Sequence, residues 1–246
     1  MNHFFITPDQ INENKLIITG SDIRHIKTVL RMKVGDEASF SDGISPSLYR
    51  GIMTEVNDEG ISFDIIYIQD TNHELPSQVY LLQGLPKADK MESIIQKAVE
   101  LGIYEIIPVK TARSIVRLDE KKAQTKLKRW QNISEAAAKQ SKRQTIPIVH
   151  NIMNFDEAVR FISQMDIKII PYELADDFEK TKKAIERIEP GQTIAILIGP
   201  EGGFTSQEIN FAIEAGINPV TMGKRILRTE TAAFVILSWI MYHLEE

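Results

Sequence analysis

The chain contains no cysteine among its 246 residues. Disulfides, thiolate zinc ligands and cysteine nucleophiles are therefore excluded, and nothing points to an oxidising compartment. The amino-terminal stretch lacks a basic segment followed by a long apolar core, so no secretory signal is expected. The longest apolar run, residues 232–241, is interrupted by Ser238 and is about half of the roughly 20 residues that span a bilayer. We therefore expect a soluble cytoplasmic protein with no membrane partner.

Motifs of several common enzyme classes are also missing. The five histidines are scattered and lack the spacing of metal ligands, so no metal site is expected. The sequence has no GxSxG turn for a serine nucleophile and no Walker or GxGxxG pattern for nucleotide phosphates. The composition, with 43% hydrophobic and 26% charged residues, is that of a globular protein with one large or two modest cores.

The hydrophobic pattern changes near residue 75. Before it, short strands surround one short helix, and residues 61–68 alternate in a way that predicts one buried face. This pattern predicts a small β-barrel or sandwich over residues 1–71. From residue 75 to residue 246, apolar strands alternate with helices, which predicts a parallel sheet covered on both faces. The expected strands lie at residues 79–85, 104–110, 167–173, 194–199 and 219–223.

The helices between these strands carry signals of their own. Asp89 and Asn154 each stand three residues before a glutamate, which predicts capped helix starts at both positions. A long helix is expected at residues 118–142 and a charged surface helix at residues 177–188. The last helix, residues 231–246, is apolar on nearly every side. It must therefore be buried against more than one surface, and a subunit interface is one way to supply the second.

Two turns between residues 194 and 228 organise the rest of the chain. An apolar strand ends in a turn with three glycines and one proline, and Thr205 with Glu208 predicts a capping box for the following helix. A second strand ends at Gly223 and is followed by three cations, which are Lys224, Arg225 and Arg228. Parallel sheets bind ligands at the carboxyl ends of adjacent strands, so a ligand other than ATP or NAD is expected here. The alternative is a pair of turns whose glycines only bend the chain.

Two clusters of basic residues occur in a chain whose net charge is −5. Residues 110–143 hold eleven Lys and Arg against three Asp and Glu, and a second cluster surrounds the predicted short helix. Local positive charge of this kind predicts contacts with RNA phosphates, and a histidine can stack on a base. Solvated helix faces are the alternative. The residues predicted to bind RNA are Arg24, His25, Arg31, Lys121, Lys128 and Arg143.

Glu201 and Arg228 each have two interpretations. The Glu201 carboxylate either contacts a ligand or a substrate base, or it binds nearby backbone amides of its own turn. Arg228 either serves the site or pairs with an acid across an interface. Thr229, directly after Arg228, is expected to cap the last helix.

Five segments, which occur in the expected order, resemble one known family. They are RHIKTVLRMKVGD (residues 24–36), KADKMESIIQKAVELG (87–102), SEAAAKQSKR (134–143), GPEGGF (199–204) and MGKRILRTETA (222–232). The chain resembles the bacterial RsmE family over nearly its whole length. That family comprises the 16S ribosomal RNA (uracil-N3)-methyltransferases of the SPOUT superfamily.

The resemblance implies an α/β protein with two domains. A PUA-like RNA-binding β-barrel is expected at residues 1–71, and a SPOUT methyltransferase domain with a parallel sheet and a trefoil knot at residues 75–246. The resemblance also implies a homodimer, S-adenosyl-L-methionine as the cofactor, and 16S ribosomal RNA or the small ribosomal subunit as the partner. The cofactor contacts carried over are Leu85, Pro171, Ile198, Gly199, Pro200, Gly202, Met222, Gly223, Ile226, Leu227, Arg228, Thr229 and Ala232.

The residue types suit methyl transfer from a sulfonium. This reaction is an in-line displacement, so the protein mainly positions the donor methyl and the acceptor nitrogen and keeps water out. Arg228 and Arg225 are predicted to favour the uracil anion, and Glu201 to orient the base. Two rival functions share these features. One is a ribose 2′-O-methyltransferase of the same superfamily acting on tRNA, and the other is a ribosome-assembly factor that binds RNA without catalysis.

Overall fold

The computed structural model describes residues 1–57, 59–70, 73–116, 118–173, 175 and 177–245. The chain forms two compact units. The amino-terminal unit comprises Met1–Glu74 and Ala138–Ile146, and the carboxyl-terminal unit comprises Leu75–Ala137 and Pro147–Glu246. Arg117, one of the eleven cations of the basic block, and Thr71, the predicted end of the first domain, lie outside the described residues.

The amino-terminal unit is built on a six-stranded sheet of order β1-β4-β5-β6-β3-β2. Its strands pair antiparallel except for β1 and β4, which run parallel. The strands are β1 (Asn2–Phe5), β2 (Ile11–Asn12), β3 (Lys15–Ile18), β4 (Glu37–Ser41), β5 (Ser47–Val56) and β6 (Ile61–Asp70). The 3-10 helix η1 (Pro8–Gln10), the helix α1 (Ser21–Arg24) and the π-helix η2 (His25–Leu30) connect them.

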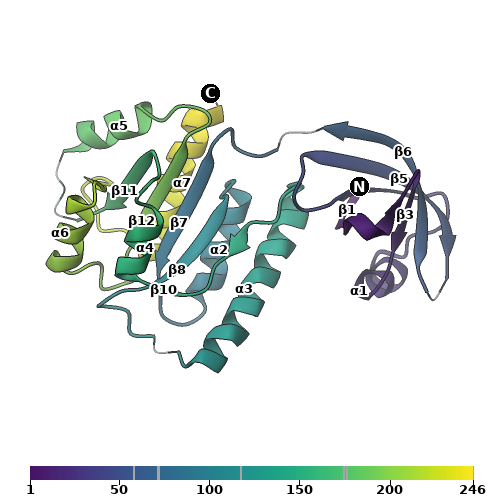
Figure 1. Ribbon diagram of the computed structural model, residues 1–246, viewed down its shortest axis with the longest axis horizontal. Coiled ribbons are helices and arrows are strands. Elements are labelled where there is room, and N and C mark those ends of the chain that lie inside the picture. Colours follow the sequence, from purple (N-terminus) through teal and green to yellow (C-terminus); the bar gives the residue numbers. More distant parts are fainter. Residues whose placement is uncertain (58, 71–72, 117, 174, 176, 246) are drawn as a thin grey trace. The chain divides into compact units, whose positions relative to one another are not determined.

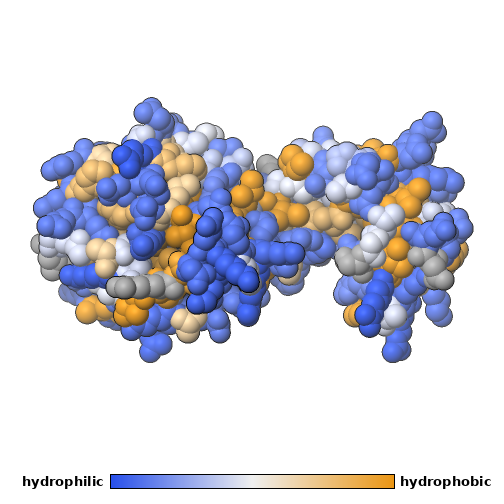
Figure 2. All heavy atoms as spheres, turned by 60° about the horizontal axis from the view of Figure 1, so that its bottom comes forward, coloured by the Kyte–Doolittle hydropathy of each residue, from blue (hydrophilic) through white to orange (hydrophobic). Residues whose placement is uncertain are grey.

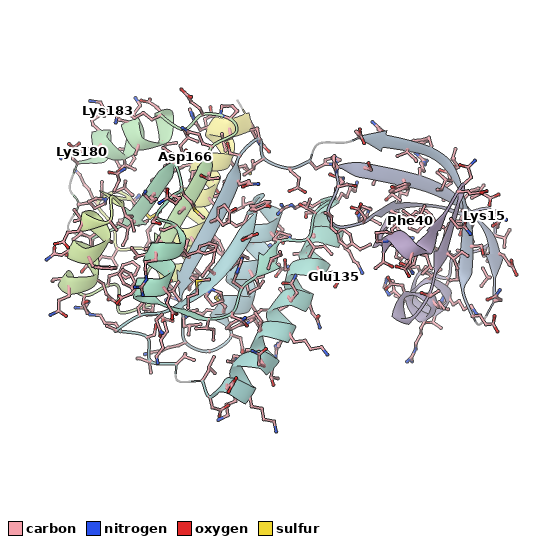
Figure 3. The ribbon with its side chains drawn as sticks, in the orientation of Figure 1. Lys15, Phe40, Glu135, Asp166, Lys180 and Lys183 are labelled. Carbon is pink, nitrogen blue, oxygen red and sulfur yellow. The ribbon has the colours of Figure 1, made fainter. Side chains whose placement is uncertain are left out.

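Aromatic side chains fill the core of this sheet. Phe40, which is labelled in Figure 3, lies with its ring centroid 5.9 Å from that of Phe4 and 4.8 Å from that of Phe63. The predicted alternation in β6 is present only in its first half. Ile61 and Phe63 are fully buried, whereas Tyr67 is 42% exposed and lies beneath the guanidinium of Arg50.

His3 occupies a polar position within the same unit. Its Nδ1 lies 3.1 Å from Ser39 Oγ, and its Nε2 lies 3.0 Å from Ser41 Oγ. Burial, reinforced by the positive charge of Lys139 and by His73, lowers the pKa of His3 from 6.5 to about 4. A neutral imidazole satisfies both contacts, because one nitrogen donates to a hydroxyl and the other accepts from one.

The carboxyl-terminal unit contains a seven-stranded sheet in which every pair is parallel. The order is β10-β8-β7-β12-β11-β13, with β9 also paired to β8. The five predicted strands correspond to β7 (Gln78–Gly84), β8 (Glu105–Lys110), β11 (Ile167–Pro171), β12 (Thr193–Ile198) and β13 (Asn218–Val220). The two short strands β9 (Ile148–Val149) and β10 (Met153–Asn154) were not predicted.

Helices cover both faces of this sheet (Figure 1). They are α2 (Lys90–Glu100), α3 (Glu120–Ser141), α4 (Phe155–Phe161), α5 (Phe178–Glu186), α6 (Ser206–Glu214) and α7 (Thr229–Glu245). One face packs against α4 and α6 through a core that includes Leu82, Ala158, Leu197 and Ile209. Helix α7 packs against α2, α5 and β12. Lys180 and Lys183 point outwards from α5, as expected of a charged surface helix (Figure 3).

The helix starts show which capping predictions hold. The box at Thr205 is present, since its Oγ1 accepts from Glu208 N–H at 3.2 Å and the Glu208 carboxylate accepts from Thr205 N–H at 2.8 Å. The box at Asn154 is also present. Asp89 is the N-cap of α2, as predicted, but its side chain makes no capping bond, so the predicted capping box was wrong. Thr229 is the first residue of α7, and its hydroxyl binds the Gly199 carbonyl instead.

Helix α7 has an exposed portion as well as a buried one. Ala233, Ile236 and Ile240 are fully buried, whereas Tyr242 is 68% exposed. The ring of Phe178 on α5 is 49% exposed and meets Trp239 edge-on. Among the described residues, no helix is both long and apolar enough to cross a membrane.

Acidification is expected to destabilise the amino-terminal unit through His3. The pKa of His3 is lowered to about 4 in the folded state, so between about pH 6.5 and pH 4 the unfolded chain binds a proton that the folded chain does not. The contribution of neutral His3 to the free energy of unfolding is therefore fully present above about pH 6.5. It has fallen by about 2 kcal/mol at pH 5 and falls no further below about pH 4. Urea unfolding of wild-type protein and His3→Gln at pH 7 and pH 5 measures this. The variant should lose less stability between the two pH values, and an equal loss would contradict the assignment.

Candidate active site

A cavity of about 470 Å³ lies where the strands of the carboxyl-terminal unit end. Three strand ends contribute to it. They supply residues 171–173 from the end of β11 onwards, residues 198–204 from the end of β12 onwards and residues 221–229 after β13. Lys90 from α2 and Ala232 from α7 complete the described lining. This is the edge at which parallel sheets bind ligands, because the connecting loops meet there.

The first loop, residues 199–204, is seated directly on the neighbouring strand. A Cβ atom on Gly84, the last residue of β7, would lie 2.6 Å from Pro200 Cδ, a distance that real Cβ atoms essentially never show. Gly203 has φ +65°, a conformation that favours glycine. The strand end and the loop therefore approach each other closely, and the glycines of the loop that line the cavity offer it main-chain atoms.

Glu201 lies in this loop and is held by α2. Its Oε1 lies 3.0 Å from Lys90 Nζ, and its carboxylate accepts from the Lys87 N–H at 3.2 Å. Partial burial acts to raise the pKa of Glu201, but hydrogen bonds from its own backbone N–H, from Lys90 and from Lys87 N–H outweigh burial and lower it. The Glu201 hydrogen bond in turn raises the pKa of Lys90, with a further contribution from Glu230 at 3.3 Å. The lysine thus connects the loop to the first turn of α7.

The second loop is fixed to α5 through a pair of threonines. Thr181 Oγ1 donates to the Thr221 carbonyl at 2.9 Å and accepts from the Thr221 N–H at 3.0 Å. Both threonines are buried. Gly223 follows with φ +97°, so the chain turns sharply at the point where the cations begin. The side chains of Lys224, Arg225 and Arg228 are all exposed.

Thr229 connects the two loops. Its hydroxyl donates to the Gly199 carbonyl at 2.6 Å and accepts from Gln83 Nε2 at 2.9 Å. Gln83 is fully buried at the end of β7. The end of β7, the start of the first loop and the start of α7 therefore meet at one hydroxyl group.

The residues predicted to contact the cofactor or to act on the base lie at this cavity with one exception. Leu85 is buried beside β8, where its N–H donates to the Val109 carbonyl at 2.9 Å, and it does not line the cavity. Ile226 lines the cavity although it is 89% exposed. The predicted residues that line it are Pro171, Ile198, Gly199, Pro200, Glu201, Gly202, Met222, Gly223, Arg225, Ile226, Leu227, Arg228, Thr229 and Ala232.

Other lining residues were missed. Tyr172 and Glu173 follow β11, and Phe204 and Thr221 flank the two loops. Lys90 was also missed, and a single lysine in a helix gives no signal of its role. Tyr172 and Glu173 end a predicted strand, so the position of parallel strand ends was the signal available for them.

The predicted RNA-binding residues do not form one group. Arg24, His25 and Arg31 are exposed on the amino-terminal unit, and Lys121 and Lys128 are exposed on α3. Arg143 differs, because its guanidinium is 3% exposed and is bound to the Glu74 carboxylate. A buried, paired guanidinium is not available to a phosphate.

The cavity can hold a polar ligand with charges of both signs. Lys224, Arg225 and Arg228 provide positive charge, and Glu173 provides negative charge. No histidine occurs in its described lining, and no cluster of metal-ligating side chains occurs within the described residues. The described groups are suited to positioning and to electrostatic stabilisation.

Comparisons with known proteins agree with this architecture. A family model described as an RNA methyltransferase domain matches residues 73–241, and one described as an RNA methyltransferase PUA domain matches residues 18–66. Ribosomal RNA small subunit methyltransferase E of Bacillus subtilis (strain 168) is 36% identical, over 100% of this chain and 98% of that protein. The protein of the same name from Mesomycoplasma hyopneumoniae (strain 232) is 34% identical, over 97% and 98%.

A solved structure gives the same result in three dimensions. The crystal structure of a ribosomal RNA small subunit methyltransferase E from Neisseria gonorrhoeae bound to S-adenosyl methionine has a TM-score of 0.84. It is 32% identical to this chain, over 98% of this chain and 97% of that one. The fold expected from the motifs, a PUA-like sheet and a SPOUT-type parallel sheet, is thus confirmed. By full-length similarity to these relatives, this chain belongs to the ribosomal RNA small subunit methyltransferase E family.

Proposed function

We propose that this protein transfers a methyl group from S-adenosyl-L-methionine to N3 of one uridine in the 16S ribosomal RNA of the small subunit. The observation that carries the proposal is the cavity of about 470 Å³ between two glycine loops that lack a phosphate-binding pattern. The relatives named ribosomal RNA small subunit methyltransferase E, which match over nearly the whole chain, support methylation of small-subunit ribosomal RNA. The cytoplasm, where ribosomal subunits are assembled, is the proposed location.

The residues present fit this cofactor. Main-chain atoms of the first loop and the side chains of Met222 and Leu227 offer polar and apolar surface for an adenosine group. Lys224 offers a cation for the carboxylate of the cofactor. When bound, the cofactor supplies an electrophilic methyl group on a sulfonium. The relative from Neisseria gonorrhoeae was crystallised with S-adenosyl methionine, which supports the same assignment here.

The protein's chemical contribution is proposed to be charge stabilisation at the uracil. N3 of uracil carries a weakly acidic proton, and a nearby cation favours the anion that accepts the methyl group. Arg228 and Arg225 line the cavity, and no salt bridge joins either to another described residue. Their charge is therefore available. The ion pair of Glu201 with Lys90 favours a role in holding the loop over direct orientation of the base.

A homodimer and a trefoil knot complete the proposal. Tyr242 on α7, Phe178 on α5 and Ile226 at the cavity are large apolar side chains that stay 68%, 49% and 89% exposed. A second copy of the chain packed on this region would cover them. The late strand β12 lies between β7 and β11, and both loops meet at Thr229, which is compatible with a knotted path.

Removing the gene tests the proposed function directly. Nucleosides from 16S ribosomal RNA of a deletion strain should lack one N3-methyluridine by mass spectrometry, and the wild-type gene should restore it. Loss of a 2′-O-methyl group from tRNA would instead support the rival methyltransferase. Unchanged RNA, together with no calorimetric binding of S-adenosylmethionine, would support the assembly factor.

Arg228→Ala is expected to lower turnover far more than cofactor affinity. Loss of one preorganised charge near the reacting nitrogen typically costs on the order of 100-fold in rate. Single-turnover methylation and calorimetry with S-adenosylhomocysteine measure the two effects. Arg160→Ala, which removes an exposed arginine from α4, is the control. Turnover equal to wild type at saturating RNA and cofactor would exclude the role proposed for Arg228.

The charge of α3 is expected to attract RNA. Hydrophilic surface gathers over the amino-terminal end of α3 (Figure 2). Lys121 and Lys128 of this helix are exposed. Lys121→Gln with Lys128→Gln should weaken binding of unmethylated 16S RNA and reduce the slope of log K against log salt by about two. Lys180→Gln with Lys183→Gln on α5 is the matched control, with the same charge change on another surface. Equal slopes for the two double variants would contradict an RNA site on α3.

A further inference from the structure

A short turn after β8 contacts the first glycine loop at two points. Arg113 Nη1 donates to the Gly202 carbonyl at 2.7 Å. One residue earlier, the Ala112 N–H donates to Glu208 Oε1 at 2.8 Å, and Glu208 is the carboxylate of the capping box that ends the loop. The turn is itself closed, because the Ser114 N–H donates to the Thr111 carbonyl at 3.1 Å. The turn therefore has a fixed shape, and the two hydrogen bonds hold it against the first loop.

The Arg113 side chain lies over Gly202. A Cβ atom on Gly202 would lie 3.2 Å from Arg113 Cβ and 3.5 Å from its Cδ, so the arginine stem packs where a side chain would otherwise stand. A guanidinium has five N–H donors in a planar fork. One of them binds Gly202, and the others make no hydrogen bond or ion pair with the described residues. Arg113 is exposed, so these remaining donors face solvent beside the loop.

The turn that holds Arg113 lies directly before the basic helix α3 in the sequence. The chain passes from β8 through Arg113 to α3, whose exposed Lys121 and Lys128 follow within one basic block. Figure 1 shows that α3 begins on the side of the sheet toward which β7, β8 and β12 run. The cations at the start of α3 therefore lie on the same side of the sheet as the cavity. A polyanion bound to α3 and reaching into the cavity would pass along this side.

We propose that Arg113 binds a backbone phosphate of the substrate RNA while it holds Gly202. This rests on the proposed function, since it presumes an RNA substrate and a cofactor in the loop. Arginine suits both tasks, because its fork contacts a phosphate with two N–H groups while a third binds a carbonyl. Arg113 is thus a positioning residue for the loop and a contact for the RNA.

Such an arrangement couples the two ligands. RNA bound to the guanidinium stabilises the loop conformation that the cofactor needs, so each ligand tightens the binding of the other by the same factor. We expect about a 5-fold to 10-fold mutual enhancement, which is typical of such coupling. Neither ligand requires a large movement for this, because the turn already contacts the loop.

Three variants of the full-length protein test the proposal with unmethylated 16S RNA and S-adenosylhomocysteine, which fills the cofactor site without reaction. Wild-type protein should bind RNA more tightly when S-adenosylhomocysteine is present. Arg113→Gln should abolish this enhancement, weaken RNA binding about 5-fold, and reduce the salt slope by about one. Arg113→Lys retains the charge but not the fork, so it should keep the salt slope and lose the enhancement. Arg160→Gln should resemble wild type.

The outcomes separate this inference from the proposed function. A wild-type salt slope and a wild-type enhancement in Arg113→Gln would overturn the inference, even if the protein methylates RNA normally. A reduced slope with intact enhancement would also overturn it, because the phosphate contact would then be independent of the loop. If wild-type protein binds no S-adenosylhomocysteine and methylates no RNA, the proposed function itself fails. Thermal unfolding of each variant verifies that it is folded.

Discussion

The Thr229 hydroxyl joins the three segments on which the cavity depends. It donates to the Gly199 carbonyl directly after β12 and accepts from the amide of Gln83 at the end of β7, while its own backbone begins α7. Thr229 is 5% exposed and Gln83 is fully buried, so water cannot replace either partner without rearrangement. Leaving one buried polar partner unsatisfied costs about 1–3 kcal/mol. Both loops keep their shape because this junction holds.

Glycine at the strand ends allows that junction to form. Gly84 permits Pro200 to lie against the end of β7, and Gly202 permits the arginine stem of the neighbouring turn to lie across the loop. Neither contact leaves room for an unshifted Cβ atom, since the nearest atoms would be 2.6 Å and 3.2 Å away. The result is a cavity to which the glycines of the first loop contribute main-chain atoms. This suits a ligand that is recognised by shape and by main-chain hydrogen bonds rather than by a phosphate cradle.

The charged side chains near the cavity fall into two sets, one paired within the protein and one unpaired among the described residues. Lys90 connects Glu201 of the loop with Glu230 of α7, so this set of charges is largely satisfied within the protein. The exposed cations Arg225 and Arg228 line the cavity without a salt bridge to another described residue. The first set stabilises the loop, and the second remains available to a ligand. Arg143 is likewise paired within the protein, through its buried contact with Glu74, although its position in a basic block suggested that its charge would be available to RNA.

Local sequence determined the elements and the identity of the loops, because periodicity and turn residues act over a few positions. The parallel strands, the capping box at Thr205 and the two ligand loops followed from it, whereas the individual contact residues of the loops were implied by the resemblance to the family. The tertiary structure decided what depends on distant partners. It placed Leu85 beside β8 rather than in the cavity, it directed the Thr229 hydroxyl to Gly199 rather than to its own helix, and it brought Lys90 and Arg113 to the loop. No local pattern encodes these contacts, because each joins residues that lie at least 24 positions apart in the sequence.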